Sequence, residues 1–95
     1  MEVPQEIKKL IYDKKISFSH KAIRYITESK YSLSDFENAI LSGELKKKEK
    51  DELNISKYKY TIIGPAKNGN ILYTCGKIIE LEGKNYFFIT LHEAD

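Results

Sequence analysis

The sequence lacks several residues on which other classes of protein depend. Its 95 residues include no tryptophan, one methionine, two prolines and one cysteine. The single thiol of Cys75 excludes an internal disulfide and a zinc site of several thiolates, and its place in the apolar run 71–75 predicts a small buried hydrophobe. No apolar run approaches the ~18 residues that a membrane-spanning helix needs. With an acidic start that lacks a secretion signal, these absences predict a cytoplasmic protein without membrane partners.

A strong excess of one charge is missing too. Sixteen lysines and arginines stand against 14 acidic residues, for a net charge of +2. The lysines are grouped, however, at 8–9, 14–15, 46–50 and 57–59. Such groups either follow a phosphate backbone or form a solvated face that protects a sheet edge. The sequence leaves both interpretations open.

The common signatures of metal and cofactor sites are absent. The sequence contains no HExxH or CxxC motif, no glycine-rich phosphate loop and no GxSxG elbow. Its two histidines, His20 and His92, lie far apart in the chain. We therefore predict neither a metal site nor a cofactor.

The first part of the chain has helical periodicity. Length and composition fit one domain over residues 1–95. Apolar residues at helical spacing predict a helix over 4–12, within an N-terminal extension of residues 1–15. The core then covers 16–95 and begins with a short extended segment at 16–18.

Two more helices follow, each with a start signal. Ser19 is a suitable N-cap for a helix that runs to about Ser29. Ser32 and Asp35 resemble a capping box at the start of the next helix, and Gly43 is the expected stop after it.

After Gly43 the pattern changes to alternation. The dipeptide Asn68-Gly69 marks a hairpin turn, and the alternating segments predict strands at 44–49, 57–64, 71–81 and 86–92. Helices followed by a meander predict an α+β fold, with two to three N-terminal helices on one face of a four-stranded antiparallel sheet. A ligand would bind the uncovered face.

The last strand divides into two sets of side chains. Phe87, Ile89 and Leu91 are all apolar, and we expect them beneath the helices. The other set, Tyr86, Phe88, Thr90 and His92, is aromatic with a polar end. It forms either the floor of a groove or a second, half-covered face.

The histidines suggest a chemistry that needs no metal. Internal cleavage of RNA requires a base for the 2′-hydroxyl, an acid for the leaving oxygen and cations for the phosphorane. His20 and His92 can supply acid and base, and Arg24 can clamp phosphate. We therefore predict His20, Arg24 and His92 as catalytic residues. In a plainer interpretation His20 only decorates a helix start, Arg24 pairs with Glu28, and His92 is exposed and idle.

Five further residues are predicted to bind substrate. Lys57 and Lys59 add positive charge, Tyr60 and Tyr86 offer rings on which bases stack, and Glu93 lies beside His92. Both tyrosines also fit the role of half-buried strand residues, and Glu93 that of a residue flanking an exposed end.

Four segments in this order resemble a family of small prokaryotic domains of unknown function. These domains show a His-Ala pair that opens a helix with an arginine four residues after the histidine, an Ala-Ile-x-x-Gly helix end, a glycine-turn hairpin and a final Ile-Thr-Val-Tyr-Glu-Pro-Asp strand. The matching segments here are 18–24, 39–43, 68–73 and 89–95. This sequence departs from the pattern at Lys21, which separates His20 from Ala22, and at His92, where the family has tyrosine.

The resemblance implies a fold and a role. Such domains are similar to the RelE/MqsR-type toxins, many of them partners of YgiT-type zinc-finger antitoxins. It implies a RelE-like domain acting as a toxin-type RNA endonuclease, with RNA as substrate and an antitoxin as protein partner. Two alternatives stay open: a non-enzymatic RNA- or protein-binding module of the same fold, and an interaction protein that uses the Tyr86–Phe88 face. The sequence does not indicate an oligomeric state.

Overall fold

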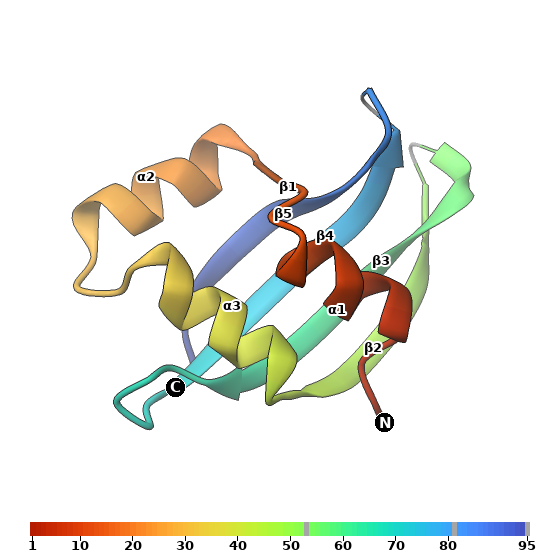
Figure 1. The fold of residues 1–95 in the computed structure, drawn as a ribbon. Coiled ribbons are helices and arrows are strands. Elements are labelled where there is room, and N and C mark those ends of the chain that lie inside the picture. Colours follow the sequence, from red (N-terminus) through yellow and green to blue (C-terminus); the bar gives the residue numbers. More distant parts are fainter. Residues whose placement is uncertain (53, 81, 95) are drawn as a thin grey trace.

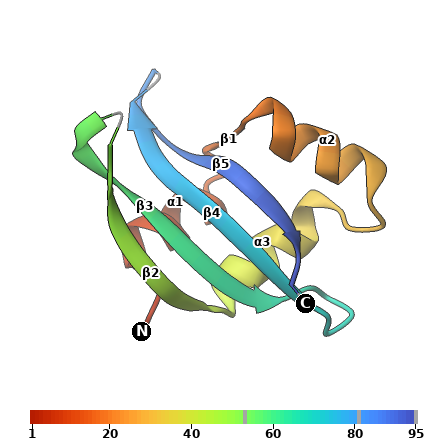
Figure 2. The same ribbon diagram turned by 180° about the vertical axis from the view of Figure 1, so that it is seen from behind.

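The computed structural model describes residues 1–52, 54–80 and 82–94, with only the backbone described for 54–57. Within these residues the chain forms three helices and five strands, and the helices lie on one face of the sheet (Figures 1 and 2). No described helix is both long and apolar enough to cross a membrane. In chain order the elements are α1 (Gln5–Tyr12), β1 (Ile16–Phe18), α2 (His20–Glu28), α3 (Leu33–Leu41), β2 (Glu44–Asp51), β3 (Asn54–Pro65), β4 (Ile71–Glu80) and β5 (Lys84–Glu93).

The α+β class is confirmed, but the prediction of four antiparallel strands is wrong. The sheet has five strands in the order β1-β5-β4-β3-β2, and β1 pairs parallel with β5. Ile16 lies opposite Tyr86, and Phe18 lies opposite Phe88. The extended segment expected at 16–18 is thus a strand of the sheet, because the chain after α1 runs along the edge of β5 and its backbone groups pair with those of β5 there.

The helix starts follow their sequence signals. The Ser19 hydroxyl accepts a hydrogen bond from the Ala22 N–H at 3.0 Å, which caps α2. At α3 the Ser32 N–H donates to Asp35 Oδ2 at 3.0 Å. Asp35 Oδ1 also accepts from the Lys67 N–H at 3.0 Å, so the same carboxylate ties α3 to the turn between β3 and β4.

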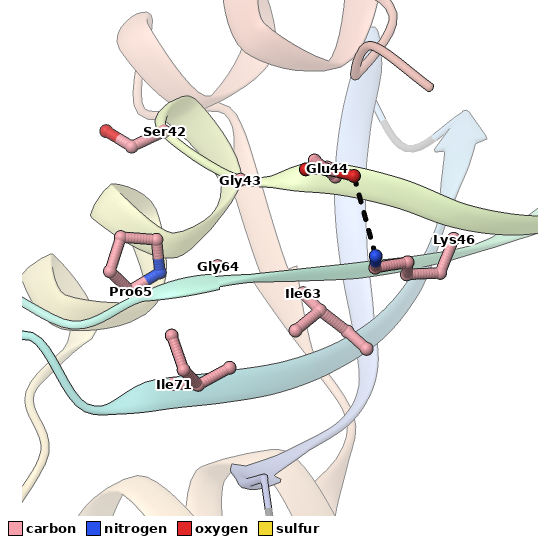
Figure 3. A pocket seen from close by; sticks show the side chains of 8 residues that line it. All are labelled: Ser42, Gly43, Glu44, Lys46, Ile63, Gly64, Pro65 and Ile71. Atoms are coloured by element: carbon pink, nitrogen blue, oxygen red, sulfur yellow. Dashed lines mark hydrogen bonds and ion pairs between the residues drawn. The ribbon is translucent and has the colours of Figure 1, made fainter.

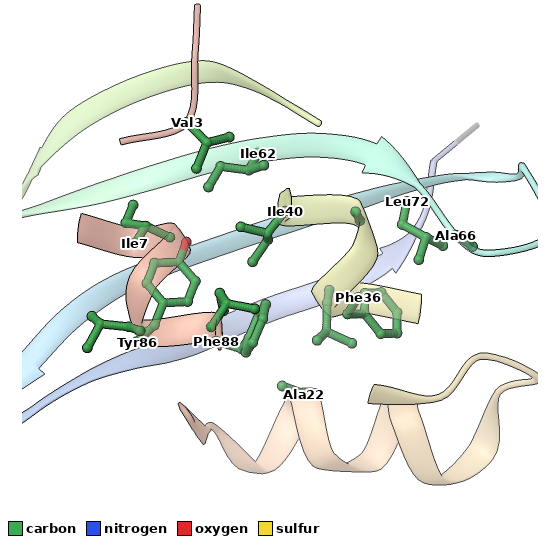
Figure 4. Packing of buried hydrophobic residues seen from close by; sticks show 14 of the residues in the cluster. Val3, Ile7, Ala22, Phe36, Ile40, Ile62, Ala66, Leu72, Tyr86 and Phe88 are labelled. Atoms are coloured by element: carbon green, nitrogen blue, oxygen red, sulfur yellow. The ribbon is translucent and has the colours of Figure 1, made fainter. Parts of the chain in front are cut away.

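The hydrophobic core lies between the helices and the sheet (Figure 4). Contrary to prediction, Tyr86 and Phe88 face the helices and are wholly buried, whereas Phe87 and Ile89 are half-buried on the uncovered face. The cause is a bulge, since the pairing with β4 shifts between residues 88 and 90. The extra residue resets the alternation, so that Leu91 is buried as predicted.

A glycine in β4 makes room for one of these rings. A Cβ atom on Gly76 would lie 2.6 Å from the ring of Tyr86. Tyr86 in turn packs edge-on against Phe88, with ring centroids 5.3 Å apart. The large buried ring therefore depends on the absence of a side chain at Gly76 on the neighbouring strand.

Candidate functional site

Figure 1 shows α2 beside β5, at the edge of the sheet. Side chains of α2 and of the end of β5 line a groove between the two elements. Its volume is about 320 Å³. One wall belongs to the helix and the other to the strand. The lining residues are Lys21, Arg24, Tyr25 and Glu28 of α2 with Leu91 and His92 of β5.

Both ends of α2 are attached to β5, which fixes the two walls of the groove. At the start of the helix the Ser19 N–H donates to the Phe88 carbonyl at 2.9 Å, and the Ser19 hydroxyl donates to the Ile89 carbonyl at 2.7 Å. Nearer its end the Tyr25 hydroxyl accepts from the Glu93 N–H at 2.9 Å. These contacts exist because β1 is only three residues long, so the edge of β5 beyond Phe88 faces the helix instead of a strand.

His92 is held in one orientation although it is exposed. Its ring stacks on Tyr73 with centroids 4.7 Å apart and planes 15° apart. Its Nδ1 lies 2.8 Å from the Glu93 carbonyl. Because a carbonyl can only accept a hydrogen bond, Nδ1 carries the proton and Nε2 is left for chemistry.

Glu93 belongs to a network behind the groove. The Tyr31 hydroxyl donates to Glu93 Oε2 at 2.7 Å and accepts from Asn70 Nδ2 at 2.8 Å. Tyr31 is only 4% exposed. The network joins the end of β5 to the start of α3 and the β3–β4 turn, so Glu93 positions its neighbour His92 while its own carboxylate is already engaged.

Two of the three predicted catalytic residues line the groove together. Arg24 and His92 come from opposite ends of the sequence. His20 is exposed at the first position of α2, one turn before Arg24, and does not line the groove. Glu28 lines it, yet within the described residues Arg24 forms no ion pair with it. Both groups are therefore available to a ligand.

The predicted substrate-binding residues are dispersed. Lys59 lies on the uncovered face, in a hollow that it shares with Lys77 and Phe87. Tyr60 packs against the core on the helix side, and burial raises its pKa. Tyr86 is wholly buried, so its predicted role as a stacking platform is wrong. The side chain of Lys57 lies outside the described residues.

Other residues of the site were not predicted as functional. His20, Arg24 and Glu28 form a polar stripe at i, i+4 and i+8 of α2, and this spacing is a sequence signal for Glu28, but no such signal distinguishes Tyr25 or Tyr73. Their roles depend on the pairing of β4 with β5 and on the position of α2, neither of which has a local sequence signal.

A second hollow, shown in Figure 3, offers less chemistry. It lies beside the end of α3, and its lining includes Gly43, Gly64 and Ile71. Cβ atoms on the two glycines would come within 2.1 and 2.0 Å of the Ala39 carbonyl oxygen, so the close approach of α3 to the strands requires them. The charged residues of this hollow, Glu44 and Lys46, already pair with each other at 3.5 Å.

The remaining reactive groups form no competing site in the described part of the chain. Cys75 is half-buried, and burial raises the pKa of its thiol, which keeps it protonated near neutral pH. No three His, Cys, Asp or Glu residues among those described gather in a way that could hold a metal ion.

No family model, curated protein or solved structure matches the chain, so the resemblance to RelE/MqsR-type toxins stays a prediction.

Proposed function

We propose that this protein is a metal-independent RNA endonuclease with a RelE-like fold, acting in the groove between α2 and β5. One observation carries the proposal: Arg24 and His92, selected from the sequence for phosphate binding and proton transfer, line the same groove. Lys21 adds a second cation there. A phosphodiester needs such cations beside a proton donor when it passes through a phosphorane.

The reaction uses two proton-transfer groups. The Glu28 carboxylate accepts the proton of the ribose 2′-hydroxyl, and the 2′-oxygen attacks phosphorus. The bond from phosphorus to the 5′-oxygen breaks, and that oxygen takes a proton from Nε2 of protonated His92. The products are a 2′,3′-cyclic phosphate and a free 5′-hydroxyl, while Arg24 neutralises the phosphorane oxygens.

Glu28 takes the place that the sequence assigned to His20. The carboxylate lines the groove and has no ion pair within the described residues. His20 lies one turn before Arg24, outside the lining residues. We expect His20 to contribute to binding of a neighbouring phosphate and not to the proton transfer itself.

The resemblance to toxin families suggests a role for this RNA cleavage in the cell. The protein would act as the toxin of a toxin–antitoxin pair, with cellular RNA as substrate and an antitoxin protein as its inhibitor. Induced expression is then expected to arrest growth and degrade RNA, and His92→Ala is expected to abolish both effects.

The direct test is cleavage of a labelled RNA by the purified protein in EDTA. His92→Ala is expected to lower the rate by about 10²–10⁴-fold, the usual contribution of an acid–base group. Glu28→Gln and Arg24→Ala are expected to lower it strongly, and His20→Ala only mildly. Lys9→Ala, an exposed change on α1, is the matched control. Mass spectrometry should find the cyclic phosphate, and full activity of His92→Ala would refute the mechanism.

A non-enzymatic RNA-binding module is the second candidate. The hollow on the uncovered face favours it, because Lys59 and Phe87 place a cation beside an aromatic ring there, while Lys77 is already paired with Asp51 at 2.7 Å. In that case RNA would bind without being cleaved, its affinity would fall steeply with salt, and Lys59→Ala would weaken binding while His92→Ala would not.

A further inference from the structure

The outer edge of the sheet is formed by β2 and is open along most of its length. β2 is the terminal strand of the order β1-β5-β4-β3-β2 and lies at the margin of the sheet (Figure 2). Every second residue of an edge strand turns its N–H and C=O away from the neighbouring strand. For residues 46–50 the described part of the chain supplies backbone partners from β3 alone. The edge therefore presents free backbone donors and acceptors.

The same edge already pairs with one residue of the chain. The Leu45 N–H donates to the Met1 carbonyl at 2.9 Å, and the Met1 amino group donates to the Leu45 carbonyl at 3.3 Å. This reciprocal exchange is the one that directly opposed residues of antiparallel strands make. The geometry of β2 thus suits the addition of another strand next to Leu45.

The charge of this edge restricts what can be added. Residues 46–50 comprise four lysines and one glutamate, and all four lysines are exposed. Lys48 lies over the ring of Tyr58, with Nζ 4.4 Å from the centroid. Lys46 pairs with Glu44 and Lys47 pairs with Glu49, each at 3.5 Å, whereas Lys50 has no ion pair within the described residues. An approaching strand therefore meets a row of lysines.

We propose that β2 binds an extended acidic segment of a partner protein, which joins the sheet as an additional strand. Backbone hydrogen bonds would supply affinity, and carboxylates opposite the lysines would supply specificity. A second copy of this chain is a poor occupant, because lysines would face lysines across the new pair. The proposal does not rest on the ribonuclease activity proposed above.

The test is a titration of the ¹⁵N-labelled full chain with a synthetic peptide that alternates glutamate with threonine. The peptide is expected to shift the amide signals of residues 46–50. The same peptide carrying N-methyl groups on alternate backbone nitrogens is expected not to bind, and neither is a peptide with lysine in place of glutamate. Binding should weaken as salt is raised.

Charge variants of the protein complete the test. Lys48→Glu/Lys50→Glu is expected to weaken binding of the acidic peptide by tenfold or more. The control variant Lys30→Glu/Lys67→Glu has the same change of net charge and should bind the peptide as tightly as the unchanged protein does. Dispersed spectra establish that both variants fold. Absence of binding, equal binding of the lysine peptide, signal shifts on the uncovered face, or self-association through β2 in sedimentation would each overturn the proposal.

Discussion

At the scale of single residues, two buried tyrosines show how the contribution of a hydroxyl depends on its partners. The Tyr86 hydroxyl is buried and has no hydrogen-bond partner among the residues that the structure describes. The Tyr31 hydroxyl is also shielded, but it donates to Glu93 and accepts from Asn70. Removing a polar group from an apolar surrounding is favourable when it is unpaired and costly when it leaves partners unsatisfied.

We therefore expect opposite results from the same chemical change. Tyr86→Phe should leave the free energy of unfolding unchanged or raise it by up to about 1 kcal/mol. Tyr31→Phe should lower it by about 1–3 kcal/mol, because Glu93 and Asn70 lose their partner. Urea unfolding of the two variants measures both values. A larger loss for Tyr86→Phe than for Tyr31→Phe would contradict this account.

The contact between Gly76 and Tyr86 gives a second prediction. Gly76→Ala places a methyl group 2.6 Å from the tyrosine ring, and overpacking of this kind costs about 1–3 kcal/mol. In a Tyr86→Leu background the cost of the alanine should fall, because the crowded ring is gone. A double-mutant cycle by urea unfolding measures the coupling. Additive effects of the two changes would show that the contact does not limit packing.

At the scale of elements, α2 is a short helix attached to β5 through Ser19 and Tyr25. Only Ala22 of its nine residues is fully buried. Helices this short are marginal by themselves, so the attachments decide whether the wall of the groove is ordered. Ser19 carries two of them, since its N–H donates to the Phe88 carbonyl and its hydroxyl donates to the Ile89 carbonyl, while the same hydroxyl caps the helix.

Ser19→Ala is expected to lower the free energy of unfolding by about 0.5–2 kcal/mol, the usual cost of a lost N-cap. It should also lower RNA cleavage, although Ser19 does not line the groove, because Arg24 loses its fixed position. Hydrogen exchange of the α2 amides reports the loosening directly. The neighbouring change Lys21→Ala should slow cleavage without raising that exchange, which separates loss of charge from loss of order.

Asp35, at the start of α3, makes the stability of the protein depend on pH. Hydrogen bonds from the Ser32 and Lys67 N–H groups lower its pKa. A lowered folded pKa means that the stabilisation is fully present above the usual pKa of aspartate, about 3.9, and is lost as pH falls through the folded value. Asp35→Asn should therefore be less stable at pH 6, and the difference from the unchanged protein should shrink below about pH 4. Thermal unfolding across this range checks the sign, and a difference that grows in acid would contradict it.

At the scale of the whole molecule, what could be predicted is what neighbouring residues determine. Helix starts at Ser19 and Ser32 follow from capping, and the strands after Gly43 follow from alternation. The parallel pairing of β1 could not be predicted, because three residues carry no signal for their partner. The faces of β5 were assigned wrongly, because the bulge at Ile89 shifts the alternation and depends on the register with β4.

The site divides in the same way. Arg24 could be predicted because its helix stripe gathers polar groups, and His92 because a histidine ends an apolar strand. Lys59, Tyr60 and Tyr86 were grouped by residue type, but Lys59 lies on the uncovered face, whereas Tyr60 and Tyr86 lie on the helix side. A substrate surface is a property of the assembled sheet, which residue type alone does not specify.

The parallel pair between β1 and β5 also has a consequence for synthesis. It joins residues 16–18 to residues 86–88, so the edge of the sheet closes only when segments from both ends of the sequence are present. While a ribosome still holds β5, Ser19 lacks its hydrogen-bond acceptors on that strand. The groove wall that carries Arg24 then lacks the opposite wall. Contacts between such distant segments form late and slowly. A nascent chain would therefore lack the groove until β5 has left the exit tunnel, and the RNA cleavage proposed above could begin only after that point.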